Sequence, residues 1–514
     1  MSRRKLVLIV VDSLRTDMLL HAAESGRAPN FARLLERGLL IEDCVSSFPS
    51  VTPVATSEIT TGAGADRHWI TGMNWYHRVE RRYVEYGSSL EATRTFGVFR
   101  SLYDVVYNMN LAHLSHEVST LFEGLADAGL RTACTPFLIY RGRRRHELSL
   151  EGLLRKVAVA ANFRHAVWGP EELFYGELYA SRRVPCKPTL ARPGTRDEYS
   201  GCVGAELVQE DLFDFLLFSL PDNDYFSHRF GPDQTLDSIE HADANVGRLA
   251  EPAGGIDAFL DKHAVVLMAD HSQTDVRAAL PLADALGAEW RVLQPNAEEP
   301  TRAELAVSPT ARAANVYMLG DESRFARTHT AVRDRLRGLE GVDLVTWLAD
   351  TEGPLRRPGG GVPHLETAEA VVQSPAGELR FRPGSGEADR RGRGWDVEGD
   401  LGALGLARAG GRLDSHEYPD ALGRLWSGLA APHAGDVVVS LTEGYECVDW
   451  GGASHVGGGS HGSLGRGDSL GPLLFCGCGP EEVAEGEQWS LRDVAGIILG
   501  HFGVTEPAYL EAAR

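Results

Sequence analysis

The sequence predicts an α/β fold, a doubly wound and mostly parallel sheet with helices on both faces, and three apolar runs carry this prediction. Residues 5–11, 211–220 and 263–269 are rich in Val, Leu, Ile and Phe. Apolar runs of this length are typical of central strands that are covered on both faces. Each run is followed by an acidic residue or by Asp and His. Such groups at the carboxyl ends of strands predict a functional site at one edge of the sheet.

The other elements follow in chain order. Residues 29–38 predict a helix that ends at a glycine, and residues 39–45 predict the strand after it. Residues 115–129 predict a second helix, and residues 130–140 predict the next strand. Residues 238–250 predict a helix, 436–441 a strand that returns to the core, and 490–503 the last helix. The stretch 353–411 is rich in Gly, Pro and Arg, which indicates loops or a peripheral sheet with an exposed strand at 378–382.

The length of 514 residues suits one large core with insertions or two to three average domains. We expect the core at residues 1–140, 201–280 and 436–514. Residues 141–200 are expected to form a cap-like insertion, and 281–435 a smaller α+β subdomain with a loop-rich insertion. The basic run at 141–145 is interpreted as a solvated face, with a substrate-contacting cap as the alternative.

The net charge and the apolar stretches limit which partners and which cellular location we expect. A net charge of -21 argues against binding of a nucleic-acid polymer, because phosphate backbones favour basic surfaces. A small phosphate-containing substrate is still compatible, since bound metals reverse the local field. No stretch is long enough to span a membrane, and the apolar run 5–11 is short and lacks a cleavage site after it. We therefore expect a cytoplasmic protein without a membrane partner.

Seven scattered cysteines are odd in number. Cys476 and Cys478 are too close together for a C-x-x-C metal knuckle, and no second pair complements them. We interpret the cysteines as reduced thiols of a cytosolic protein, several of them buried.

Thr52 is the candidate nucleophile. It follows a turn-forming Phe-Pro-Ser and precedes a run that could open a helix, whose N-terminal N–H groups favour a bound anion. A threonine hydroxyl is a weak nucleophile at neutral pH and needs a base or a metal to activate it.

The predicted strand ends and one glycine-rich loop supply candidate metal ligands. These are Asp12, Asp224, His228, Asp270, His271 and His461. Carboxylates with imidazoles, without thiolates, suit Zn²⁺ best, with Mn²⁺ or Fe as alternatives. Two such ions about 4 Å apart could hold a phosphoryl oxygen and an attacking alkoxide together.

Each candidate ligand also has a simpler explanation. Asp12 could be a helix N-cap, and Asp270 with His271 a satisfied polar pair. Asp222 competes with Asp224, which keeps the four-residue spacing to His228, and His455 competes with His461. Together, on consecutive strand ends and with Thr52 available, the residues favour a dinuclear site.

The sequence resembles the alkaline phosphatase superfamily, and within it the nucleotide pyrophosphatase/type I phosphodiesterase branch. The motifs that carry the resemblance lie in the family's order: residues 10–13, Phe-Pro-Ser-Val-Thr52 with Thr61-Gly62, 224–232, Ala-Asp270-His271 and Ser-His461-Gly-Ser-Leu. One departure is Thr52-Pro-Val-Ala, where the family often has Pro-Asn-His after the nucleophile.

The resemblance implies a role for each matching residue. One metal is expected at Asp224, His228 and His461, and the other at Asp12, Asp270, His271 and the Thr52 hydroxyl. Asn74 is expected to contact the phosphate. The implied activity is hydrolysis of a phosphodiester or nucleotide pyrophosphate through a phospho-threonine. Alternatives are a phosphomonoesterase, a phosphonate hydrolase or a catalytically silent phospho-ligand binding protein; the sulfatase motif C/S-x-P-x-R is absent around Thr52.

Overall fold

The computed structural model describes residues 4–511 except 151–154, 157, 160–162, 177, 188–194, 298–301, 321, 351–352, 356–364 and 485. Its central sheet has the strand order β2 (Leu39–Val45), β25 (Leu470–Cys476), β11 (His263–Met268), β1 (Lys5–Val11), β10 (Phe215–Leu220), β5 (Thr132–Cys134), β8 (Glu172–Tyr175) and β9 (Tyr179–Ala180). Neighbouring strands from β11 to β8 are parallel, and β2, β25 and β9 pair antiparallel at the edges. The predicted α/β fold with a mostly parallel sheet is confirmed.

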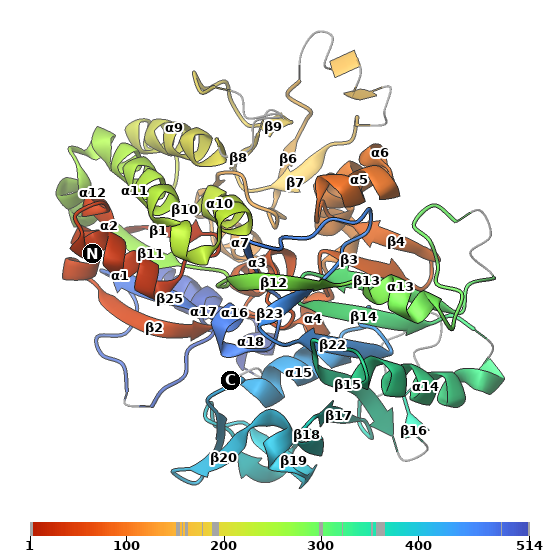
Figure 1. The fold of residues 1–514 in the computed structure, drawn as a ribbon. Helices are drawn as coiled ribbons and strands as arrows, with labels where there is room; N and C mark the ends of the chain where they lie inside the picture. Colours follow the sequence, from red (N-terminus) through yellow and green to blue (C-terminus); the bar gives the residue numbers. More distant parts are fainter. Residues whose placement is uncertain are drawn as a thin grey trace.

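Both faces of strand β1 are buried, which explains its unbroken apolar sequence. Val7, Ile9 and Val11 pack into one core. The opposite core takes the alternating residues 6, 8 and 10. Helices α1 (Thr16–Glu24), α2 (Pro29–Arg37), α9 (Arg196–Gln209), α11 (Leu236–Ala250) and α12 (Ile256–Lys262) cover the first face, and α3 (Thr52–Thr61), α7 (Leu121–Asp127) and α17 (Leu491–Phe502) cover the second (Figure 1).

A second, antiparallel sheet lies beside the first (Figure 1). Its order is β13 (Leu305–Thr310), β14 (Ala313–Met318), β22 (Val437–Leu441), β15 (Val342–Asp350), β17 (Glu369–Ser374), β18 (Gly377–Ala388) and β19 (Gly394–Gly399), with β16 (Gly353–Pro354) paired to β15. Helices α14 (Phe325–Arg337) and α15 (Ala421–Ala430) pack on its two faces.

The expectation that residues 436–441 return to the core sheet is wrong. Strand β22 lies inside the second sheet, where Val438 is in register with Asn315 on one side and Thr346 on the other. A short β-branched apolar run fits the interior of either sheet, and nothing in its sequence specifies its neighbours. The expectation of an exposed strand at 378–382 is also corrected. In strand β18, Leu379 and Phe381 are buried, and only the opposite face of the strand is open.

Two predicted elements are shorter than expected. Helix α7 begins only after Thr120, which forms a capping box with Glu123, and the strand expected at 130–140 has three residues. The division of the chain into core, cap and subdomain segments stays a prediction.

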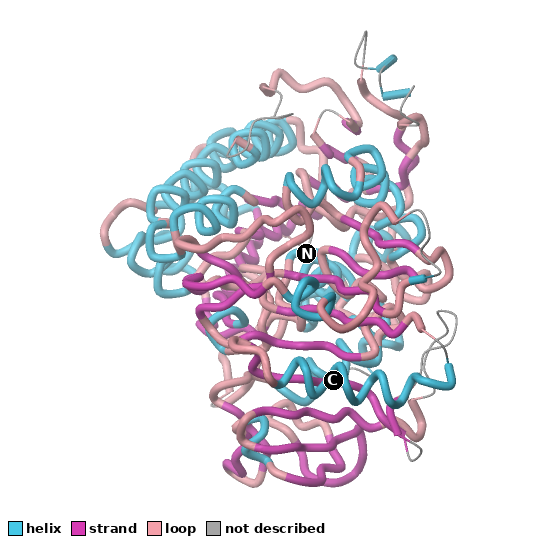
Figure 2. Tube along the Cα trace, turned by 45° about the vertical axis from the view of Figure 1, so that its right-hand side comes forward, coloured by secondary structure: helices cyan, strands magenta, loops and turns pink. Residues whose placement is uncertain are grey.

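The segment that follows β5 includes β6 (Arg144–His146) and β7 (Val167–Gly169), which lie toward the end of the molecule opposite β17 and β18 (Figures 1 and 2). The basic run 141–145 of this segment is not uniformly solvated. Arg141 is buried, pairs with Glu123 and donates to three backbone carbonyls, whereas residues 143–145 are exposed.

A disulfide between Cys186 and Cys202 ties this segment to helix α9. The expectation of reduced cysteines is therefore wrong for this pair, although the other five are free thiols. Sequence spacing could not reveal the bond, because any two of seven scattered cysteines could pair. Among the helices that the structure describes, none has the length and apolarity needed to cross a bilayer.

Candidate active site

A cleft of about 1210 Å³ opens at the carboxyl ends of β1, β10 and β11. Its walls include Thr52 and the predicted ligands Asp12, Asp224, His228, Asp270 and His461. His271 lies just beneath this surface and is buried. The strand ends thus bring together residues that are far apart in the sequence, as parallel topology predicts.

Thr52 is the first residue of α3, after an extended Val51 and a cis Phe48–Pro49 peptide. Its Oγ1 lies 3.3 Å from Nε2 of His271. The hydroxyl is therefore placed at a helix N-terminus and beside a candidate metal ligand, where negative charge on oxygen is favoured.

The segment that carries Thr52 is bonded to the loop that carries His461. The Ser50 carbonyl lies 2.8 Å from His461 Nδ1, and the Ser50 hydroxyl donates to the Ser463 carbonyl at 2.9 Å. The Gly462 N–H donates to the same hydroxyl at 3.1 Å. The segment with the candidate nucleophile and the loop with His461 are consequently held together as a single unit.

Arg424 of α15 forms hydrogen bonds to both parts of this unit, and its side chain is 2% exposed. Its guanidinium donates to the carbonyls of Ser47 at 2.9 Å and Leu464 at 2.9 Å, and to the hydroxyl of Ser469 at 2.6 Å. Sequence reasoning missed both Ser50 and Arg424, since neither belongs to a ligand pattern. The partners of Ser50 lie more than 400 residues away, and those of Arg424 include Ser47 at 377 residues and Leu464 at 40.

The first ligand group comprises Asp224, His228 and His461. His228 Nε2 lies 3.4 Å from Asp224 Oδ1 and 3.2 Å from His461 Nε2, and His461 Nε2 lies 3.7 Å from Asp224 Oδ1. Each histidine Nδ1 lies 2.8 Å from a backbone carbonyl, that of Gly459 or Ser50. These carbonyls accept Nδ1–H, so both Nε2 lone pairs face one point beside a carboxylate oxygen.

The second group comprises Asp12, Asp270 and His271, whose ligand atoms lie within 4.8 Å of one another. His271 Nε2 is 3.7 Å from Asp12 Oδ1 and 3.5 Å from Asp270 Oδ2. Both carboxylate oxygens are buried and accept no hydrogen bond. A divalent cation satisfies such oxygens at once, so the donor set fits a metal.

The two groups adjoin each other. The rings of His271 and His461 stack with centroids 3.9 Å apart, and His271 also lies within 4.8 Å of Asp224 and His461. We assign His271 to the second group because two unpartnered carboxylate oxygens face its Nε2 there.

The electrostatics of the site also suit cations. Burial raises the pKa of Asp12 well above its usual value, and burial raises the pKa of Asp270 to about 6. Burial lowers the pKa of His228, His271 and His461 to about 4 each, so these imidazoles are neutral at pH 7. Burial opposes ionisation of Asp224, yet the three histidines lower its pKa below the usual range. Neutral imidazoles and crowded carboxylates are the state that binds metal.

The competing residues have other partners. Asp222 accepts the Asp197 N–H at 2.9 Å and lies 3.1 Å from Arg196 Nε, so it secures the start of α9. His455 stacks on His228 with centroids 4.1 Å apart, and its Nδ1 lies 3.1 Å from Glu446. Neither belongs to a ligand group.

Asn74 is fully buried at the start of β3 (Asn74–His77). Its Nδ2 donates to the Pro309 carbonyl at 2.6 Å, and its Oδ1 is buried without a partner. Among the described residues, Met73 rather than Asn74 lines the cleft. Its contact with phosphate stays a prediction.

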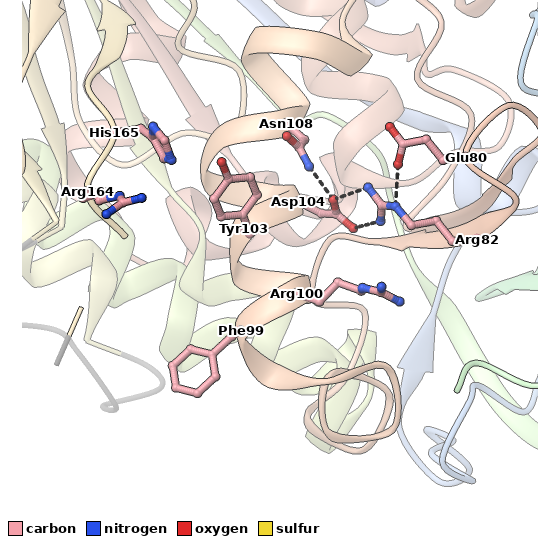
Figure 3. Close-up of a pocket in the computed structure, with 9 residues that line it drawn as sticks. All are labelled: Glu80, Arg82, Phe99, Arg100, Tyr103, Asp104, Asn108, Arg164 and His165. Carbon is pink, nitrogen blue, oxygen red and sulfur yellow. Dashed lines mark hydrogen bonds and ion pairs between the residues drawn. The ribbon is translucent and has the colours of Figure 1, made fainter. Parts of the chain in front are cut away.

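A separate pocket of about 620 Å³ shares no lining residue with the cleft. It lies between α6 (Val98–Tyr103) and the residues Arg164 and His165 (Figure 3). Its carboxylates, Glu80 and Asp104, are both bonded to Arg82. This pocket brings together none of the predicted site residues.

Comparisons with known proteins identify the family and the fold. The sequence profile of the type I phosphodiesterase/nucleotide pyrophosphatase family matches residues 6–358. The fold is similar to murine ectonucleotide pyrophosphatase/phosphodiesterase 5, with a TM-score of 0.56 and 13% identity over 98% of this chain and 96% of that one. It is also similar to phosphonoacetate hydrolase from Sinorhizobium meliloti 1021, with a TM-score of 0.50 and 17% identity over the same shares.

No curated protein sequence matches the chain. The profile match spans more than half of the chain, and it covers Asp12, Thr52, Asp224, His228, Asp270 and His271. Taken with the sheet order and the ligand geometry, it shows that the chain belongs to the type I phosphodiesterase/nucleotide pyrophosphatase family.

Proposed function

We propose that the protein is a two-metal hydrolase of phosphate esters that acts on a small phosphodiester or nucleotide pyrophosphate, with Thr52 as nucleophile. The observation that carries the proposal is the Thr52 hydroxyl, 3.3 Å from His271 Nε2 at the N-terminus of α3 and beside both ligand groups. A structure of the murine relative with a threonine replaced by alanine is described as inactive and in complex with AMP.

The residues have distinct roles in this proposal. When bound, the two cations, most simply Zn²⁺, supply Lewis acidity that favours the alkoxide of Thr52 and charge on the phosphoryl oxygens. The Thr52 oxygen forms a bond to phosphorus as the bond to the leaving oxygen breaks, which gives a phospho-threonine. Water then hydrolyses this ester. Ser50 and Arg424 keep the nucleophile in place, and Asn74 is proposed to orient the phosphate.

Phosphonate hydrolysis is the second candidate, and the fold likeness to phosphonoacetate hydrolase favours it. A phosphomonoesterase uses the same nucleophile and ligands. A small phosphate-containing substrate is part of each proposal. The cytoplasmic location stays a prediction, and the disulfide between Cys186 and Cys202 argues against it, because such bonds form in oxidising compartments.

The test compares bis-p-nitrophenyl phosphate, p-nitrophenyl phosphate and phosphonoacetate on Zn²⁺-loaded protein. We expect the diester to be cleaved fastest. Thr52→Ala should abolish turnover while metal stays bound through the other ligands. Thr60→Ala is the control, because Thr60 is a buried residue of the same helix that bonds the Thr56 carbonyl. Undiminished activity of Thr52→Ala contradicts the nucleophile assignment, and fastest cleavage of phosphonoacetate favours the second candidate.

A further inference from the structure

Ser13 connects the two ligand groups. It follows Asp12 directly after β1 and is 3% exposed. Its Oγ lies 2.7 Å from Asp224 Oδ1 and 3.2 Å from His271 Nδ1. One hydroxyl thus touches a ligand of each group.

The hydrogen-bond roles at Ser13 follow from its partners. The ionised Asp224 carboxylate can only accept, so the Ser13 O–H donates to it. Gln273 Nε2, at 3.1 Å, then donates to the Ser13 oxygen, and so does the Nδ1–H of His271, which it shares with the Ser272 carbonyl at 3.3 Å. Donation from Nδ1 leaves the Nε2 lone pair of His271 free for the second group. The result is a relay from His271 through Ser13 to Asp224.

The backbone at this position indicates that the hydroxyl is needed there. Ser13 has a φ of 58°, in the left-handed region where a glycine is less strained than any residue with a Cβ. Strained residues of this kind persist where the surroundings hold them. Here the Ser13 N–H donates to Asp270 Oδ1 at 3.1 Å, so backbone and side chain both bond to ligand residues.

Gln273 holds Ser13 and Asp224 in place through hydrogen bonds. It is fully buried, donates to Asp224 Oδ1 at 2.5 Å and accepts the Ser227 hydroxyl at 2.8 Å. Asp224 Oδ1 therefore receives two donors, which leaves one orientation for its carboxylate. Any change in the His271 ring alters the geometry of the Ser13 oxygen and, through it, the Asp224 oxygen.

We propose that Ser13 is a positioning residue that couples occupancy of the two metal sites. This inference rests on the proposed two-metal function. Asp12, Asp270 and His271 would hold one ion through their oxygens and Nε2, and the His271 imidazole would then keep its Nδ1–H toward Ser13, whose hydroxyl keeps Asp224 oriented for the other site. By linkage, an ion at the other site favours the first equally.

The test is a titration of metal-free protein with Co²⁺, followed by calorimetry and by the visible absorption of the ion. Wild type should take up two ions cooperatively. Ser13→Ala and Ser13→Gly should bind the second ion about tenfold to a hundredfold more weakly and without cooperativity. Because Ser13→Gly also relieves the backbone, its melting temperature should stay close to that of wild type while its metal affinity falls.

Ser272→Ala is the matched control. Ser272 is equally buried and adjacent to His271, but its hydroxyl donates to the Leu470 carbonyl and to no metal ligand. It should show the wild-type isotherm. Non-cooperative binding by wild type, an unchanged isotherm in both Ser13 variants, or the same defect in Ser272→Ala overturns the proposal. Since the readout is metal binding, inactivity toward every phosphate ester leaves this result intact and instead contradicts the proposed function.

Discussion

Arg424→Lys tests whether the hydrogen bonds of Arg424 to the segment that precedes Thr52 affect turnover. Arg424 makes five hydrogen bonds, to Ser47 twice and to Pro419, Leu464 and Ser469 once each. A lysine ammonium has three donors and lacks the planar fork, so at least two bonds are lost. Each buried bond contributes about 1 kcal/mol, and more where an acceptor is left unpaired, so unfolding should cost about 2–4 kcal/mol less.

The effect on catalysis should exceed the effect of instability alone. Loss of the bond to Ser47 loosens the segment that places Thr52, and displacement of a nucleophile by about 1 Å costs roughly 10²-fold. We expect kcat to fall about 10- to 100-fold with little change in KM, measured with the diester. Urea unfolding of the same samples measures the change in the free energy of unfolding.

Arg141→Lys is the matched control for this variant. Arg141 is also buried, and it bonds Glu123 and the carbonyls of Leu114, Ser115 and Val118, none of which belongs to the site. It should lose similar stability and keep its kcat. If the two variants lose kcat equally, Arg424 acts only through general stability and the reasoning is refuted.

Three further predictions follow from described contacts. His461→Asn and His228→Asn should each remove about one metal equivalent and most activity, and unchanged metal content by elemental analysis in both contradicts the ligand assignment. Replacement of Cys186 and Cys202 by serine should lower the free energy of unfolding by about 3 kcal/mol, because the bond closes a loop of 16 residues; equal unfolding curves with and without reductant refute this. Burial lowers the pKa of His68 to about 3, so the folded state binds fewer protons than the unfolded state between about pH 3 and 6.5, and stability is lost as the pH falls through that window. Between pH 7 and pH 5, His68 should lower the free energy of unfolding of the wild type by about 2 kcal/mol. His68→Asn should lack this loss, so its free energy of unfolding should fall by about 2 kcal/mol less over the same range. Parallel pH profiles for the two proteins contradict this prediction.

The sheet, and the gathering of the candidate ligands at one of its edges, were predictable because their signals are local. Residues 6–11 and 264–269 are apolar along their whole length, and the position just past a strand determines which edge Asp12 and Asp270 occupy. The spacing of Asp224 and His228 matches one turn of α10 (Asp222–Phe230), which brings Oδ1 and Nε2 to 3.4 Å.

The features that sequence reasoning missed are contacts between distant segments. Ser50 and His461 are 411 residues apart, and no periodicity relates them. Strand β22 is apolar enough for either sheet, so its neighbours decide its place. No local pattern marks Arg424 as a buried residue, and its guanidinium bonds the carbonyls of Leu464 and Ser47, which lie 40 and 377 residues away.

The bond between Ser50 and His461 also bears on how the protein matures during synthesis. Residues 1–280 emerge from the ribosome with Thr52 and most of the candidate ligands, yet β25 inserts between β2 and β11 only when residue 476 is available. Until then, β2 and β11 present open strand edges and a partial cluster of carboxylates and imidazoles. Contacts of such long sequence separation form slowly, so a chain truncated before residue 459 should be a substrate for chaperones rather than an enzyme.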